Sequence, residues 1–284
     1  MSSESNDRKP ESIEPGPSSG AKARRSSRAP SAWGQVRDAV SSVHNLEALL
    51  RSPSVKYKVI RDLLPELRQG ARVLVELFTP QAGDGPSDEA TEQVCAYGLA
   101  VATSLEQLLD ATDVANDERE DLTTRALQLA GELEASTDLL ALLERAASPA
   151  PTSVSLRLIV RQTQRLWGGA RGGELAVRLD ESAPDASVDV DPYVVGPLLS
   201  LVLALSQAAG AGEVVVRASS SGAGAVLTAG PAGAGDAALR TVPVRVLPAV
   251  PPTEKTARQV AAAIGAVLEL NGAHAELRFP RVST

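Results

Sequence analysis

Few side chains in this 284-residue sequence are suited to catalysis or metal binding. There are two histidines, His44 and His274, and one cysteine, Cys95. A zinc site built from several histidine and cysteine ligands is therefore disfavoured, and no disulfide can form within the chain. No stretch has the serine, histidine and acid pattern of a nucleophilic triad. We predict no metal site and no cofactor, and His44 is the candidate for a catalytic group.

A Gly/Ala-rich stretch, Gly230 to Ala238, is a second place where chemistry is conceivable, because Gly230, Gly233 and Gly235 would let a phosphate approach the backbone. Glycine-rich loops hold phosphates where the loop opens a helix and a lysine follows. Here no lysine follows, and the next segment alternates like a strand. We therefore interpret the stretch as a flexible loop between two strands.

The net charge of −7 is unevenly distributed. Residues 31–150 contain ten basic and twenty acidic side chains, whereas the residues on either side are weakly positive. Most of the excess lies between Asp84 and Arg145, with fifteen carboxylates and three arginines. Such a surface repels the phosphates of nucleic acids and suits a basic or amphipathic protein. We expect a protein partner and no nucleic acid.

Residues 1–30 combine Ser, Pro, Gly and charged side chains with almost no apolar ones, which predicts a disordered basic tail. The strongest apolar stretch, Val194–Leu205, has twelve residues and is interrupted by Gly, Pro and Ser. A membrane-spanning helix needs about twenty apolar residues. The polar N-terminus also lacks the apolar core of a signal peptide. We expect a cytoplasmic protein without membrane contact.

Residues 31–147 show the three- and four-residue spacing of amphipathic helices. Helices are expected at about residues 32–50, 54–78, 87–111 and 116–147. The last two are joined by a short turn and would form an acidic helical hairpin. An apolar seam along the fourth helix is suited to pairing with another helix, in the same chain or in a second copy. This seam includes Leu129, Leu133 and Leu140. We predict a helical interaction module and a homodimer.

Prolines at 149 and 151 end the helical pattern, so residues 148–152 are expected to form a linker. Residues 153–284 then alternate between helix-like and strand-like patterns, which predicts an α+β chain. Helices are expected at Ser153–Trp167, Pro192–Ala209 with Asp191 as its cap, and Thr253–Leu270 with Gly272 as its stop. Strands are expected at Glu174–Leu179, Glu213–Ala218, Ala223–Thr228, Val242–Leu247 and Ala275–Phe279.

This order of elements resembles that of a bacterial sensor histidine kinase, in which a helical dimerisation hairpin precedes an ATP-binding domain of the GHKL type. The resemblance covers about residues 87–284. The stretches that carry it are "SVSLRLIVRQTQRLW" (Ser153–Trp167), "VDPYVVGPLLSLVLALSQAAGAGEVVVRA" (Val190–Ala218) and "AAIGAVLELNGAHAEL" (Ala262–Leu277). It implies an all-α hairpin or bundle followed by a GHKL-like α/β sandwich, in which helices cover a mixed sheet.

The nucleotide-binding positions of that family are not retained. Its asparagine box aligns with "LLSLVLALSQAA", which places Ser200 and Ala204 where the asparagines stand. The second asparagine holds magnesium in the family, and alanine has no oxygen to offer the ion. In "PAGAG", Pro231 replaces the adenine-binding aspartate, while Gly233 and Gly235 are kept. The later glycine box is replaced by "EKTARQV", without glycine. The resemblance therefore implies a degenerate, pseudokinase-like domain.

The acceptor histidine of the family is also not recognisable. There, an acidic residue follows the histidine at once and a proline follows about four residues later. His44 is followed by Asn45 and Leu46, and the next proline is Pro53. The expected acceptor place, "AVATSLEQLL" (Ala100–Leu109), contains no histidine. We interpret His44 as a solvated or partner-facing helix residue, with phosphotransfer as the alternative.

Three functions follow from these patterns. The first is a non-catalytic, histidine-kinase-like regulator that acts by protein contacts in two-component signal transduction, for which the resemblance implies a response-regulator receiver domain as partner. The second is a histidine phosphotransferase that relays phosphate through His44. The third is a helical or coiled-coil scaffold, which predicts no mixed α/β sandwich after residue 152.

Overall fold

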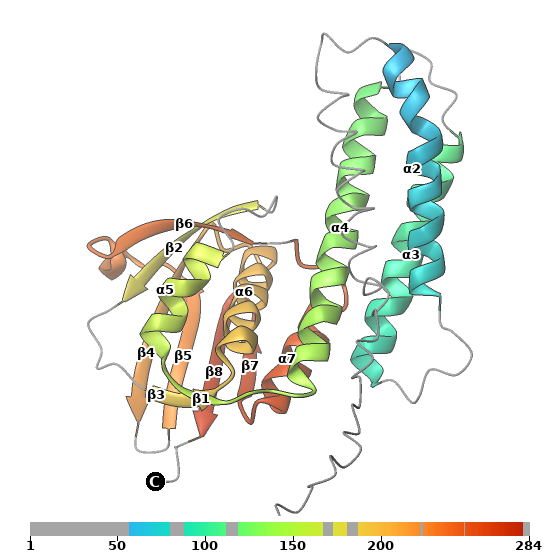
Figure 1. The fold of residues 1–284 in the computed structure, drawn as a ribbon. Helices are drawn as coiled ribbons and strands as arrows, with labels where there is room; N and C mark the ends of the chain where they lie inside the picture. Colours follow the sequence, from blue (N-terminus) through green and yellow to red (C-terminus); the bar gives the residue numbers. More distant parts are fainter. Residues whose placement is uncertain are drawn as a thin grey trace, which may run out of the picture.

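The computed structural model describes residues 57–79, 88–111, 119–166, 173–180, 187–221, 224–246 and 248–280. Helices α2, α3 and α4 (Tyr57–Phe78, Glu89–Ala111 and Arg119–Ala146) form a helical region. The α/β region that follows contains β1 (Thr152–Ser155), α5 (Leu156–Leu166), β2 (Gly173–Asp180), β3 (Ser187–Val190), α6 (Pro192–Ala208), β4 (Glu213–Ser221), β5 (Gly224–Pro231), η2 (Ala234–Asp236), β6 (Arg240–Val246), α7 (Thr253–Ala263), β7 (Val267–Asn271) and β8 (His274–Pro280). Figure 1 shows the two regions side by side, with α4 nearest to the α/β region.

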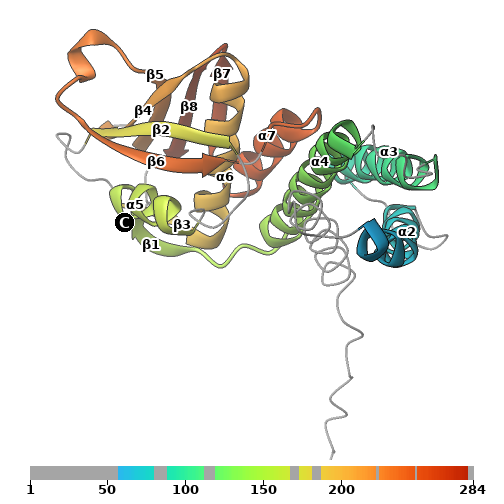
Figure 2. The same cartoon turned by 90° about the horizontal axis from the view of Figure 1, so that it is seen from above.

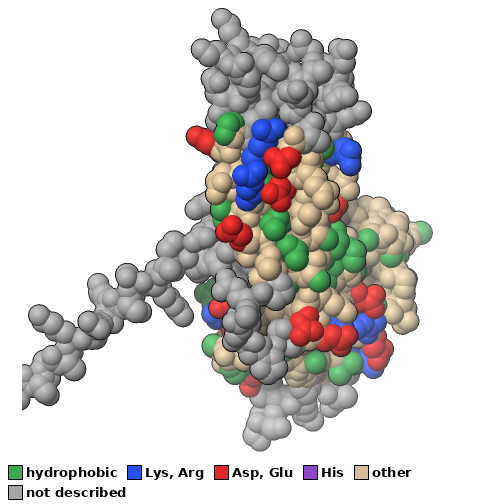
Figure 3. All heavy atoms as spheres, turned by 90° about the vertical axis from the view of Figure 1, so that its right-hand side faces the viewer, with side chains coloured by type: hydrophobic (Ala, Val, Ile, Leu, Met, Phe, Trp, Pro, Cys, Tyr) green, Lys and Arg blue, Asp and Glu red, His purple; other side chains and the backbone are tan. Residues whose placement is uncertain are grey.

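The helical region is ordered α2, α3, α4, with α3 in contact with both neighbours. The Phe78 ring of α2 lies against Gly98 of α3, where a Cβ atom would be only 2.5 Å from the ring. On the outer side, Arg68 donates to the Leu109 carbonyl oxygen at 2.9 Å. Figure 3 shows acidic and basic side chains mixed on this face, with a largely uncharged surface between two charged areas.

Helix α4 is buried on more than one side, because it contacts α3, α6 and α7. In its second half, Ala135 and Leu139 lie on one face of the helix and Leu140 on another, and all three are at most 3% exposed. A helix segment that is buried on several sides lacks the single apolar stripe of a surface helix. The two regions are therefore packed together, with α4 as the shared element.

The main sheet has six strands in the order β6-β2-β4-β5-β8-β7. β2 and β4 are parallel, and the other neighbours are antiparallel. Parallel neighbours need a crossover connection, which α6 provides. β1 and β3 form a separate antiparallel pair. Figure 2 shows α5 and α6 on the same face of the sheet.

The two faces of the sheet differ in chemistry because side chains alternate along each strand. The helix-covered face carries apolar side chains that are at most 2% exposed, including Leu175, Val177, Val214, Val216, Leu227 and Leu277. The opposite face, here called the charged face, carries Arg178, Glu213, Arg217, Glu276 and Arg278. The fold class expected from the sequence, an α+β chain whose mixed sheet is covered by helices, is confirmed.

One expected helix is wrong in its second half. The pattern predicted a helix from Thr253 to Leu270, but α7 ends at Ala263 and β7 occupies Val267–Asn271. Gly265 has φ +73°, a conformation that ends a helix cheaply only at glycine. Gly272, expected to stop the helix, instead turns the chain between β7 and β8 with φ +60°.

Other differences are smaller. The helix expected from Ser153 begins at Leu156, because β1 takes up residues 152–155 and pairs with β3; neither strand was expected. β4 and β5 extend beyond the expected hairpin strands, to Ser221 and Pro231. The expected 1–30 tail and 32–50 helix lie outside the described residues. Across the described helices, none is both long and apolar enough to span a bilayer.

Candidate functional site

Helix α6 carries the two positions that the resemblance aligned with nucleotide-binding asparagines. The helix begins where expected: Asp191 is its N-cap and its carboxylate accepts from the Tyr193 NH group at 2.9 Å. Pro192 occupies the first helical position, where a missing NH group costs nothing. Ser200 and Ala204 follow on one face and are only 2% and 4% exposed. The structure therefore places both positions inside the protein.

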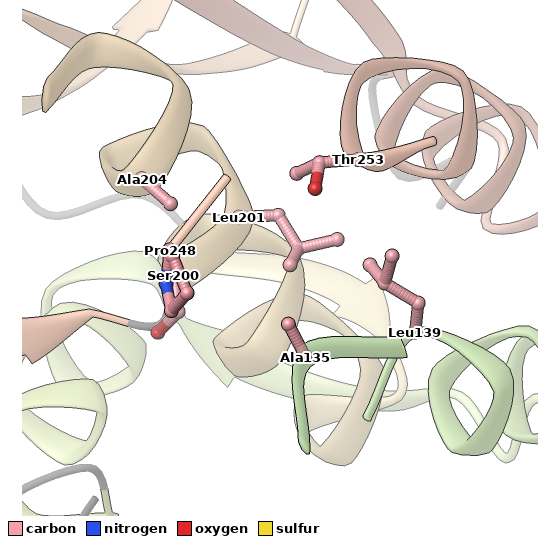
Figure 4. A pocket seen from close by; sticks show the side chains of 7 residues that line it. All are labelled: Ala135, Leu139, Ser200, Leu201, Ala204, Pro248 and Thr253. Carbon is pink, nitrogen blue, oxygen red and sulfur yellow. The ribbon is translucent and has the colours of Figure 1, made fainter. Parts of the chain in front are cut away.

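What buries this face is the helical region. Figure 4 shows a small cavity with Ala135 and Leu139 from α4 on one side and Ser200, Leu201 and Ala204 from α6 on the other. Pro248, which precedes α7, and Thr253, the first residue of α7, complete the lining of the cavity. The cavity has space for about one water molecule. A nucleotide cannot enter unless α4 moves.

The lining of the cavity offers little polar chemistry. Its polar side chains are the hydroxyls of Ser200 and Thr253, and Thr253 already accepts the Val250 NH group at 2.9 Å. The Ser200 hydroxyl has no hydrogen-bond partner among the described residues. No carboxylate or amide is among the lining side chains, so the space offers a hard cation only two uncharged hydroxyls and offers a base no amide or carboxylate.

The loop after β5 contains Gly233 and Gly235, the two glycines that match the family pattern, and it lies against the charged face. Arg217 of β4 pairs with the Asp236 carboxylate, and Arg178 of β2 donates to the Asp236 carbonyl oxygen at 2.6 Å. The Gly233 NH group donates to the same carboxylate at 2.9 Å. Both arginines alternate with core residues and so point away from α6. The loop is thus held by ion pairs and hydrogen bonds.

These contacts change the acidity of the carboxylates involved. The hydrogen bond from Gly233 and the Arg217 guanidinium hold the pKa of Asp236 below its ordinary value. Arg178 forms a two-pronged pair with Glu213, at 2.5 and 2.8 Å, and lowers the pKa of Glu213. Paired arginine and carboxylate groups of this kind fix geometry as well as charge.

The five aligned positions are therefore not brought together. Ser200 and Ala204 face α4 on the helix-covered side, whereas Gly233 and Gly235 belong to the loop bound to the charged face. Pro231 ends β5 and is exposed. A nucleotide site would need these positions around one space, and the described residues provide no such space around them.

The other candidate residues are placed as follows. His44 lies outside the described residues. Leu133 and Leu140 of the seam are 0% and 3% exposed and belong to the core of this chain, with Leu129 half-buried against it. Any contact of these residues with a partner or second copy stays a prediction. Within the described ranges, no cluster of His, Cys, Asp and Glu is arranged to hold a metal ion.

The contacts of two aspartates were not predicted from the sequence. Asp236 lies in a glycine-rich loop, and nothing else in the sequence marked it. Its two arginine partners are 19 and 58 residues away. Asp191 was expected only as a helix cap, but it also binds Arg145 at 2.9 Å. Neither long-range pairing has a sequence spacing that could have indicated it.

No family model matches this chain, and no curated protein is similar enough to count as a match. Several solved structures have a similar arrangement. The histidine kinase AdeS of Acinetobacter baumannii is 12% identical with a TM-score of 0.41, over 64% of this chain and 96% of that chain. The ATP-binding domain of PrrB from Mycobacterium tuberculosis is 19% identical with a TM-score of 0.31, over 47% and 98%.

A histidine kinase from Burkholderia phymatum is 19% identical with a TM-score of 0.32, over 68% of this chain and 97% of that chain. Similarity at this level assigns no activity to the present chain. The residues of α6, α4 and the loop after β5 have to be judged by their own geometry.

Proposed function

We propose that this chain is a non-catalytic, histidine-kinase-like regulator that acts through protein contacts in bacterial signal transduction. The observation that carries the proposal is the covering of α6 by α4. Where the resemblance calls for asparagines, Ser200 and Ala204 are buried against Ala135 and Leu139, around a space for about one water molecule.

The chemistry of the covered face supports the same proposal. ATP carries several negative charges and requires a divalent cation with oxygen ligands. Ala204 offers no oxygen, and the Ser200 hydroxyl is a single uncharged ligand among alkyl side chains, which is a poor set for such a cation. The loop with Gly233 and Gly235 is held on the charged face by Asp236, whose carboxylate already takes the Gly233 NH group that a phosphate would need.

Calorimetric titration of the full chain with ATP and Mg²⁺, together with thermal unfolding in their presence, tests this proposal. We expect no heat of binding and no shift of the unfolding temperature. An active histidine kinase ATP-binding domain serves as the positive control. The variant Leu139→Ala enlarges the space beside α4 and should also fail to bind, because the ligands are missing as well. Micromolar, Mg²⁺-dependent binding to the unaltered chain would overturn the proposal.

For partners, we propose a receiver-like domain, which the resemblance implies, and a second copy of the chain, which the apolar seam of the fourth helix predicts. Leu133 and Leu140 of the seam are inside the chain. A contact would therefore use the outer surfaces of α3 and α4, where half-buried and exposed carboxylates such as Glu92, Glu134 and Glu144 lie. Light scattering of the full chain tests the homodimer. A mass equal to one chain at micromolar concentration would reject it.

The helical-scaffold alternative expected no mixed sheet after residue 152, and the six-stranded sheet removes its main support. The phosphotransferase alternative depends on His44, outside the described residues, and no structural observation favours it.

A further inference from the structure

Two ion pairs connect the helical region to the α/β region. The last turn of α4 meets the start of α6 through Arg145 and Asp191. The start of α3, which lies beside the second half of α4, meets α7 through Glu89 and Lys255. The apolar contact around Ala135, Leu201 and Ala204 lies between the two regions as well.

Asp191 is the most heavily bonded residue of this contact. Its Oδ2 atom accepts from Arg145 Nε at 2.9 Å and from the Ala150 NH group at 3.0 Å, while Oδ1 accepts from the Tyr193 NH group. One carboxylate thus joins the end of α4, the linker and the first turn of α6. The Arg145 guanidinium also lies over the exposed Tyr193 ring, 5.3 Å from its centre.

The two members of this pair differ in exposure. The Asp191 side chain is 0% exposed, whereas the Arg145 side chain is 46% exposed. Burial alone would raise the pKa of Asp191, but the NH groups of Ala150 and Tyr193 together with Arg145 lower it. A buried carboxylate that loses a charged partner is destabilised strongly, because water cannot replace the lost contact. Loss of the Arg145 charge therefore leaves a buried carboxylate with its two NH donors and without its positively charged partner.

The connection between α3 and α7 is weaker. Glu89 is 75% exposed and Lys255 is 33% exposed, so water and salt screen the pair. Asp88 also accepts a hydrogen bond from Gln259, and it caps α3 by accepting the Thr91 NH group at 2.8 Å. We therefore expect Glu89 and Lys255 to stabilise the contact between the regions less than Arg145 and Asp191 do.

The apolar contact between α4 and α6 has one local defect. Beside Ala135 and Leu139 it contains a cavity for about one water molecule and the unpaired Ser200 hydroxyl. Empty space costs packing energy, and an unpaired buried hydroxyl adds a desolvation cost. This part of the contact is therefore less stable than a filled core would be, and the Arg145–Asp191 pair adds to its stability.

We propose that Arg145 and Asp191 form a latch that keeps α4 closed over α6, and that breaking this latch lets the helical region move away from the α/β region and exposes the face that carries Ser200 and Ala204. The latch joins the last turn of α4 to the N-cap of α6, and the Ala150 NH group connects it to the linker. The proposal of a latch does not depend on whether the chain binds nucleotide, so its test is independent of the proposed function.

Hydrogen exchange of the full chain, followed by mass spectrometry, tests the latch with two variants. Arg145→Gln removes the charge from the exposed side. Asp191→Asn removes it from the buried side but keeps the helix cap, because asparagine caps as well as aspartate. In both variants we expect exchange to speed up about tenfold in α4 around residues 133–143 and in α6 around residues 198–206, the size expected for losing one charge-assisted hydrogen bond.

Arg278→Gln is the matched control, because Arg278 is 50% exposed and pairs with Glu269 on the charged face, away from α4. It should leave exchange in α4 and α6 unchanged. The latch is rejected if Arg145→Gln behaves like the control. It is also rejected if exchange in β4, β5 and β8 rises as much as in α4 and α6, because the chain is then merely less stable. The Arg145→Gln variant decides the question if Asp191→Asn fails to fold.

Discussion

The two faces of the sheet were built by the same strands but carry opposite chemistry. The helix-covered face consists of aliphatic side chains packed beneath α5, α6 and α7, whereas the charged face is held by ion pairs such as Arg178–Glu213 and Arg217–Asp236. The positions aligned with nucleotide boxes are divided between them. Ser200 and Ala204 lie in α6 on the side of the helix-covered face, and Gly233 and Gly235 lie in the loop on the side of the charged face.

This division teaches that the two faces stabilise the fold to different degrees. Stability depends mainly on the covered face, because apolar burial is the larger favourable contribution. The charged face contributes less, because its ion pairs are partly exposed to water. Three sets of variants test this difference.

The largest effect is expected from paired substitutions on one strand of the sheet. Leu227 and Val226 are neighbours on β5, and Leu227 points into the core with 2% exposure. Leu227→Ala should lower the free energy of unfolding by about 2 to 5 kcal/mol, because it leaves a cavity. Val226→Ala, half-buried on the charged face, should lower it by about 1 kcal/mol or less. Urea unfolding measures both, and equal losses would contradict the difference between the faces.

A middle-sized effect is expected from restoring an asparagine on the covered face. Ala204→Asn puts an amide into a space lined by alkyl groups, so we expect a loss of about 1 to 3 kcal/mol in unfolding free energy. We expect no ATP binding, because the other aligned positions, Pro231, Gly233 and Gly235, do not surround the same space.

Ala208→Asn is the control for this substitution, since it makes the same change at the exposed end of α6. Its unfolding free energy should stay within about 0.5 kcal/mol of the unaltered chain. If Ala204→Asn is equally neutral, α4 does not cover that face in solution.

The smallest effect concerns pH on the charged face. The pKa of Asp236 is lowered from its ordinary value of 3.8, so the unfolded chain takes up a proton there before the folded chain does. Stability from this carboxylate is complete above pH 3.8 and is lost as the pH falls below it, towards the pKa of the folded state.

Asp236→Asn removes this titration. Its unfolding midpoint in urea should therefore be lower than that of the unaltered chain at pH 7, and this difference between the two midpoints should be smaller at about pH 3. A difference that stays constant, or grows in acid, would show that the loop is not held by charge. Sodium chloride at high concentration should reduce the difference at pH 7, because salt screens exposed pairs.

Much of the fold was readable from the sequence because helix and strand periodicities are local. The helices α2, α3, α4 and α6 and the strands β2, β4, β5, β6 and β8 lie where expected to within a few residues. The cap at Asp191 followed from residue type and position. The stretch after Ala263 failed because a short apolar run fits a helix or a strand equally well. The strands β1 and β3 have only four residues each, too few for a period to show.

The candidate site was only partly readable. The residue types at Ser200, Ala204 and Pro231 were known from the sequence, and from them a lack of suitable ligands could be argued. Their burial could not be predicted, because a seam of Leu129, Leu133 and Leu140 fits a partner helix as well as a helix of the same chain. The structure buries Leu133 and Leu140 inside the chain.

By itself, the amino-acid sequence determined where the longer helices and strands form, which of their side chains are apolar, and which residue types stand at the aligned positions. These properties depend on neighbours along the chain. The tertiary structure alone decided that α4 lies over α6, that the glycine loop is bound to the opposite face, and that Asp191 meets Arg145. The arginine contacts of Asp236 and Asp191 join residues 19 to 58 positions apart. They depend on which faces meet in space, and no local period records that choice.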